Sequence, residues 1–227
     1  MSYAYPTQQV PRAANHQGYP RQAHFVPPPR AVEPDLIGIV AFADCATPIL
    51  PLVQITSPQA LTAPMQLRPE GNTNLTAGLR MAHAWLRKLP KHIVRRVCVI
   101  ADGEPNRDNE ALISTVVAMR ADWITIDSIF CGTSEAGARV LRKISEATVG
   151  GHFHSATSYQ ALTDVVTSAP SRIHKRQGAT VLIVDCSTSM EESMPGGGGT
   201  RICAAIKACQ NMALVKRVAF NRVGAHS

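Results

Sequence analysis

Residues 180–189 read TVLIVDCSTS, and this stretch decides the fold. Its first five residues are apolar or β-branched without interruption, which is typical of a strand buried on both faces of a sheet. The strand ends directly in Asp185, and Ser187 and Ser189 follow at alternate positions. Alternate residues of an extended loop project to the same side. The stretch therefore predicts a buried strand that delivers one carboxylate and two hydroxyls to the edge of a sheet.

Apolar runs and helical spacings alternate along the rest of the chain from Asp35 onward. Strands are predicted at 36–42, 48–53, 96–101, 123–130, 151–154 and 180–184. Helices are predicted at 75–89, where Pro90 ends the helix, at 135–148 and at about 200–220. Two more are predicted to begin after capping residues, one after Asp108 or Asn109 and one after Ser158. This alternation indicates an α/β fold: a doubly wound, mostly parallel central sheet with helices on both faces. The prolines of 48–53 place that strand at an antiparallel edge.

Several large or reactive side chains are expected in the core. Both tryptophans, Trp85 and Trp123, are predicted to be buried, and Cys45 and Cys186 are predicted to pack as small hydrophobes. The helix after Asn109 is expected to turn four residues inward: Leu112, Ile113, Val116 and Val117.

Composition narrows the class of protein. The chain has 227 residues, 45% hydrophobic and 17% charged, with a formal charge of +7. No apolar run approaches the roughly 18 residues of a membrane helix, and the N-terminus lacks a secretory pattern. Six cysteines without a C-x-x-C pair favour a reduced, cytoplasmic location. The basic residues are spread along the chain without a nucleic-acid-binding motif, so solvated helix faces are the simpler interpretation.

The first 34 residues differ from the rest. They hold seven of the chain's 16 prolines and show no apolar periodicity. Such a segment buries too little apolar surface to offset its ordering entropy. We therefore expect a proline-rich disordered tail over 1–34 and a single domain over 35–227.

Two further polar segments fall at the same predicted edge as Asp185. Asp102 directly follows the strand 96–101, and Thr73 lies in the loop 71–75, GNTNL, which opens onto a helix. Ligands of open α/β sheets bind at the carboxyl ends of the strands. Two carboxylates and several hydroxyls are hard oxygen donors, which suit Mg²⁺, Mn²⁺ or Ca²⁺. Because hydroxyls are neutral, they cancel none of the ion's charge, and such a site would still attract a carboxylate from a partner protein.

The pattern resembles the metal-ion-dependent adhesion site of the von Willebrand factor A domain. That site combines D-x-S-x-S, a threonine in a later loop and an aspartate in a D-G turn. Asp185, Ser187 and Ser189 match the first element, Thr73 the second and Asp102 the third. The resemblance covers about residues 35–223. It implies metal coordination by these five residues and a protein-binding module rather than an enzyme.

The order of the elements differs from that of the family. The family begins with the D-x-S-x-S strand and its helix, whereas this chain ends with them, which indicates a circular permutation. Residues 170–179 would then join the family's last helix to its first strand, which is central in the sheet. A closed monomer, a dimer that swaps the segment after Ala179, and a truncated tandem of two domains all satisfy this order.

An enzymatic alternative uses Asp185 as a phosphoryl acceptor beside Mg²⁺. Haloacid-dehalogenase phosphatases, which work in this way, carry a second carboxylate two residues later, where this chain has Ser187. Turnover of a phosphate ester that Asp185→Asn abolishes would favour this alternative.

Overall fold

The computed structural model describes residues 33–103, 105, 110–168 and 177–224. By its contacts the chain divides after Ala31, and all the described residues belong to the second unit, Val32–Ser227. Apart from its last two residues, the tail predicted for 1–34 lies outside the described residues. The caps predicted at Asp108 and Asn109 lie outside them as well.

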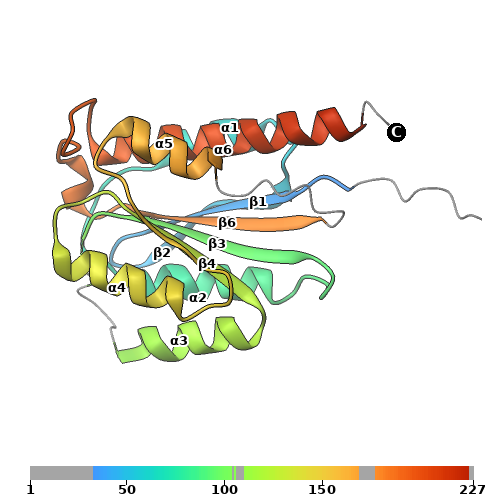
Figure 1. Cartoon of the computed structure of the whole chain (residues 1–227), viewed down its shortest axis with the longest axis horizontal. Helices are drawn as coiled ribbons and strands as arrows, with labels where there is room; N and C mark the ends of the chain where they lie inside the picture. Colours follow the sequence, from blue (N-terminus) through green and yellow to red (C-terminus); the bar gives the residue numbers. More distant parts are fainter. Residues whose placement is uncertain (1–32, 104, 106–109, 169–176, 225–227) are drawn as a thin grey trace, which may run out of the picture. The chain divides into compact units, whose positions relative to one another are not determined.

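A six-stranded sheet forms the middle layer, in the order β2-β1-β6-β3-β4-β5 (Figure 1). The strands are β1 (Leu36–Phe42), β2 (Ala46–Gln54), β3 (Val94–Ala101), β4 (Ile124–Phe130), β5 (Phe153–Ser155) and β6 (Gly178–Asp185). Only β2 runs antiparallel, along β1 at the edge of the sheet, and every other neighbouring pair is parallel. The predicted fold class and the antiparallel edge strand are therefore confirmed.

The last strand in the sequence lies in the interior of the sheet. Leu182 of β6 pairs with Ile39 of β1 on one side and with Cys98 of β3 on the other. Every residue of β6 after Gly178 is buried. The uninterrupted apolar run of β6 fits this position, because helices cover both faces of the sheet.

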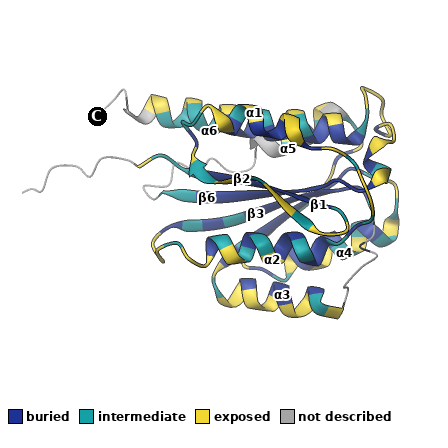
Figure 2. Cartoon of the chain, turned by 180° about the vertical axis from the view of Figure 1, so that it is seen from behind, coloured by how far each residue is buried: buried dark blue, intermediate teal, exposed yellow. Residues whose placement is uncertain are grey.

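Helices form the two outer layers. They are α1 (Gln59–Thr62), α2 (Leu75–Leu86), α3 (Glu110–Ala121), α4 (Glu135–Glu146), α5 (Tyr159–Ser168) and α6 (Arg201–Gly224), with the 3₁₀ turns η1 (Ala63–Gln66) and η2 (Thr188–Glu191). One core cluster lies between the sheet and α1, α5 and α6, and the other between the sheet and α2, α3 and α4 (Figures 1 and 2). The helix predicted to continue to residue 89 ends at Leu86, four residues before Pro90.

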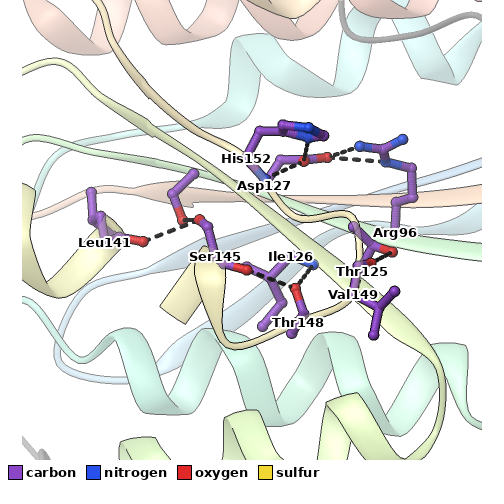
Figure 3. A network of polar contacts seen from close by, with 10 residues as sticks. Arg96, Thr125, Ile126, Asp127, Leu141, Ser145, Thr148, Val149 and His152 are labelled. Atoms are coloured by element: carbon purple, nitrogen blue, oxygen red, sulfur yellow. Dashed lines mark hydrogen bonds and ion pairs between the residues drawn. The ribbon is translucent and has the colours of Figure 1, made fainter. Parts of the chain in front are cut away.

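A polar network ties β4 to its neighbours (Figure 3). Asp127 of β4 accepts hydrogen bonds from the guanidinium of Arg96 on β3 and, at 3.1 Å, from the backbone N–H of His152 before β5. On the other face, Ser145 of α4 donates to Ser128 at 2.7 Å. Each buried polar group in this network has a partner, so the network fixes β5 and α4 without leaving an unsatisfied charge.

Four of the core predictions are wrong. Ile113 and Val117 are 61% and 60% exposed, because α3 packs through only one side, against α2 and β4. Trp123 is 82% exposed and has a φ of 57°. It occupies the position just after α3, where a left-handed residue commonly ends a helix and where glycine is the usual choice. For a residue with a Cβ this conformation costs about 1 kcal/mol. Cys45, in the turn between β1 and β2, is exposed as well, whereas Cys186 is buried as predicted.

Candidate functional site

Three loops meet at the carboxyl edge of the sheet. The N–H of Glu70 donates to the carbonyl of Cys186, and the N–H of Thr188 donates to the carbonyl of Gly71 at 3.2 Å. Gly71 has a φ of 69°, and a Cβ there would lie 2.3 Å from a carboxylate oxygen of Asp44. The loop that carries Thr73 is thus held against the loop that follows β6.

Asp185 ends β6 with a carboxylate that has no solvent exposure. Its Oδ1 accepts the N–H of Ser187 at 2.8 Å, whereas its Oδ2 accepts no hydrogen bond from the described residues. Burial raises the pKa of Asp185 to about 7; the hydrogen bonds from Ser187 oppose the shift, and the charge of nearby Asp102 adds to it. A buried carboxylate with a free oxygen is costly unless a cation or a proton neutralises it.

Two serines connect Asp185 to the second carboxylate. Ser187 Oγ lies 3.0 Å from Ser189 Oγ, and Ser189 Oγ donates to Asp102 Oδ1 at 2.9 Å. Since Ser189 has one hydroxyl hydrogen and gives it to Asp102, its Oγ is left as an acceptor toward the Ser187 hydroxyl. The lone pairs of the Ser187 hydroxyl therefore remain available beside Asp185.

Close packing between backbone segments fixes the position of Asp102. This residue follows β3, and a Cβ on Gly132, which lies just beyond β4, would come within 1.7 Å of the Asp102 carbonyl oxygen. The N–H of Cys131 donates to the carbonyl of Ala101 at 2.9 Å. Only glycine at 132 allows this approach, so the ends of β3 and β4 fix the backbone of Asp102.

Arg201 is the site residue that sequence reasoning missed. Its Nη1 donates to Asp102 Oδ2 at 2.8 Å and to the carbonyl of Ser189 at 3.2 Å, and its Nη2 lies 2.8 Å from a carboxylate oxygen of Glu192. Burial alone would lower the pKa of Arg201, but the hydrogen bond and charge of Asp102 outweigh burial and raise that pKa. The guanidinium is therefore a permanent positive charge inside the site.

A glycine-rich turn delivers Arg201 to this position. Gly197, Gly198 and Gly199 all have positive φ, and the N–H of Met194 donates to the carbonyl of Gly199 at 2.9 Å. The chain folds back on itself and enters α6 at Arg201. A positive side chain in the first turn of a helix interacts unfavourably with the positive end of the helix dipole. An arginine at this position therefore indicates that a nearby carboxylate compensates its charge.

Four of the five predicted site residues are thus joined through hydrogen bonds: Asp185, Ser187, Ser189 and Asp102. Thr73 is 5% exposed, and its loop reaches the same region through the contact of Gly71 with Thr188. Beside that loop lies a pocket of about 330 Å³, which Cys45, Cys186 and Gly71 help to line.

The chemistry of this set is that of a hard-oxygen site. Within the part of the chain that the structure describes, no three His, Cys, Asp or Glu side chains gather in a way that could hold a metal ion. The site instead combines two carboxylates with neutral hydroxyls, which suits Mg²⁺ or Ca²⁺ better than zinc. The free Oδ2 of Asp185 is the oxygen that such a cation would satisfy.

Comparison with known proteins identifies the family. The model of the von Willebrand factor type A domain matches residues 32–168, more than half of the chain, and the chain belongs to this family. The matched range includes Thr73 and Asp102 and ends before β6 and α6, so it excludes Asp185, Ser187 and Ser189. Domains of this family are commonly protein-interaction modules.

Three solved structures resemble parts of the chain. A von Willebrand factor type A protein from Catenulispora acidiphila is 19% identical, with a TM-score of 0.49 over 56% of this chain and 30% of that one. The SpRpn10 VWA domain is 23% identical, with a TM-score of 0.49 over 60% of this chain and 72% of that one. An uncharacterized membrane spanning protein from Vibrio fischeri is 18% identical, with a TM-score of 0.32 over 60% and 75% of the two chains. No curated protein matches the chain.

Among the described residues, no helix combines the length and the apolar character needed to cross a membrane.

Proposed function

We propose that this chain is a cation-dependent protein-binding module. Asp185, Ser187, Ser189, Thr73 and Asp102 would hold one Mg²⁺, or Mn²⁺ or Ca²⁺, and the ion would bind a carboxylate of a partner protein. The observation that carries the proposal is the fully buried carboxylate of Asp185, with one oxygen free and a serine hydroxyl beside it. A hard divalent cation is the group that best compensates such an oxygen.

The charges support binding of an external anion. Asp185 and Asp102 carry two negative charges, and Arg201 neutralises one of them. A divalent cation would therefore leave these three buried groups with a net charge of about +1, which attracts a carboxylate, and the exposed Glu192, which also pairs with Arg201, would reduce this charge. Because Asp102 already accepts hydrogen bonds from Arg201 and Ser189, we expect it to hold the ion through water rather than directly, while it orients Ser189.

We also propose that the order of the elements is a circular permutation of the family order. β6 and α6 lie beyond the matched range 32–168, yet β6 is an interior strand of the sheet. We favour a closed monomer formed by a single domain over 35–227. Light scattering then gives about the mass of one chain, 24.4 kDa. Twice that mass would indicate a dimer that swaps β6 and α6.

A cytoplasmic location completes the proposal. All six cysteines are free, and Cys98, Cys131, Cys186 and Cys209 are buried as thiols. Burial raises the pKa of both Cys186 and Cys209 to about 12, so these thiols stay protonated and unreactive. Free cysteines in this number are typical of a reducing compartment.

Calorimetry with Mg²⁺ and Mn²⁺ alone tests the metal site. We expect one ion per chain, and we expect the Ser187→Ala, Ser189→Ala double variant to lose most of the affinity. The matched control is Ser114→Ala on α3, an exposed serine whose hydroxyl donates to the carbonyl of Ala111 and not to a site residue. Equal binding by the double variant would refute the ligand assignment. Magnesium-dependent turnover of p-nitrophenyl phosphate that Asp185→Asn abolishes would instead favour phosphoryl transfer.

A further inference from the structure

The turn after α3 presents an aromatic side chain to solvent at the edge of the sheet opposite to Asp185. Trp123 is 82% exposed and adopts a left-handed φ of 57°. Glycine fits that conformation without strain, whereas a side chain with a Cβ does not. The fold therefore keeps a large apolar ring in water at a position where glycine would be more stable, which is the kind of local strain found at functional positions.

The residues around Trp123 hold the turn in place. The Asp122 carboxylate lies 2.6 Å from His83 Nε2 on α2. The Asp122 carbonyl accepts a hydrogen bond from Arg95 at 3.1 Å, and Arg95 also donates to the carbonyl of Leu89 at 2.6 Å. These contacts fix the backbone of Asp122, so Trp123 is displayed on a rigid turn.

Cations surround this turn. The buried guanidinium of Arg95 joins the loop after α2 to the loop after α3. The first loop carries Lys88 and Lys91, and Arg120 lies in the last turn of α3. All three side chains are exposed, and none forms an ion pair with a described residue. Asp122, the one acid in these two loops, is already paired with His83.

We propose that Trp123, Lys88, Lys91 and Arg120 form a docking surface, the Trp123 edge, for an acidic protein segment that carries an apolar side chain. The unpaired cations complement carboxylates, and the indole ring offers the apolar contact. Exposed apolar neighbours favour a protein over a nucleic acid: Val117 lies on α3, and the Val149 carbonyl accepts a hydrogen bond from Thr125 near the start of β4. Binding at this surface requires no metal.

A fluorescein-labelled peptide, Glu-Asp-Leu-Glu-Asp-Phe-Glu-Asp-Leu, tests this surface by anisotropy with the full chain at low salt. EDTA is present throughout, because carboxylates would also bind a metal at Asp185. We expect saturable binding that weakens as salt rises. Trp123→Gly and the Lys88→Glu, Lys91→Glu pair should each weaken binding at least about tenfold. The Trp123→Gly variant should unfold at no lower temperature than the parent chain, which separates a binding role from a structural one.

Two control substitutions lie in η1 and α6, on the face of the sheet opposite to α3. Met65→Ala removes another exposed apolar side chain and Lys207→Glu reverses another exposed lysine, and both should leave binding within about twofold. A version of the peptide with serine in place of leucine and phenylalanine should bind at least about tenfold more weakly. Failure of the peptide to bind, equal binding by Trp123→Gly, or preferential binding of oligo-dT would overturn the proposal.

Discussion

The charged side chains at the carboxyl ends of the strands (the carboxyl edge) and at their amino ends (the amino edge) differ in burial and pairing. At the carboxyl edge, Asp102 and Arg201 are buried and paired with each other, and Ser189 forms a hydrogen bond with each of them. At the amino edge, Lys88 and Lys91 stand in solvent without ion pairs to the described residues. Removing one member of a buried pair leaves an uncompensated charge, whereas removing an exposed charge costs little. Substitutions at the first edge should therefore lower stability strongly, and those at the second should change stability little and act mainly on binding.

The largest effect is expected when β6 and α6 are removed together. A chain that ends at Gln177 retains every residue of the Trp123 edge but loses β6, an interior strand of the sheet. Because β6 pairs with both β1 and β3, both would be left with open edges, and we expect a chain without cooperative thermal unfolding. A chain that ends at Asn221 is the control and should fold. A well-dispersed NMR spectrum from the shorter chain would show that the two edges are independent.

Arg201→Ala should have the next largest effect. The substitution leaves Asp102 buried without its cation, which typically costs about 3–5 kcal/mol of unfolding free energy. Arg120→Ala at the opposite edge, where the side chain is exposed, should cost less than about 0.5 kcal/mol. Urea unfolding of both variants in EDTA measures the contrast.

Adding Mg²⁺ tests the same difference in stability between the two arginine variants. If the proposed cation binds beside Asp102, Mg²⁺ should restore part of the stability that Arg201→Ala loses and leave Arg120→Ala unchanged. Equal losses in the two variants without metal would remove the distinction between a buried and an exposed edge.

The sequence predicted the carboxyl edge better than the amino edge, and the reason is physical. Strand ends are fixed by uninterrupted apolar runs, so Asp185 and Asp102 could be placed at one edge of the sheet from the pattern alone. Ser187 and Ser189 followed from the alternation of an extended loop. These residues carry their own local signal, and hydrogen bonds join all four in the structure.

Arg201 and Trp123 could not be predicted in the same way. The partner of Arg201 lies 99 positions earlier in the chain, and only the turn through the glycines brings the two together. The exposure of Trp123 depends on α3 packing through one side, which leaves Ile113 and Val117 exposed as well. When apolar residues lie on every side of a short helix, the sequence does not show which side packs against another element of the fold.

The pH dependence of stability should follow Asp185 at the carboxyl edge. The folded chain holds the Asp185 proton up to about pH 7, whereas the unfolded chain releases it near the ordinary value of 3.8. Between these values the folded state binds more protons, so the unfolding free energy in EDTA should fall as pH rises, by a few kcal/mol at most, about 1.4 per pH unit.

Asp185→Asn separates this titration from all others. The difference between the parent and variant unfolding profiles should slope between pH 4 and 7 and be flat above, and saturating Mg²⁺ should reduce the slope. A difference profile without slope in EDTA would mean that Asp185 is ionised throughout and already compensated within the protein.

The smallest expected effect isolates the backbone strain of the amino edge. Trp123→Gly and Trp123→Ala both delete an indole that is 82% exposed, so the loss of packing is small and nearly equal. Only glycine relieves the left-handed φ of 57°, because alanine keeps the Cβ. The glycine variant should therefore be the more stable of the two by about 1 kcal/mol in urea unfolding, somewhat offset by the flexibility that glycine adds to the unfolded chain. Alanine equal to or better than glycine would mean that the turn relaxes out of the left-handed region once the indole is gone, and that the ring itself holds the turn.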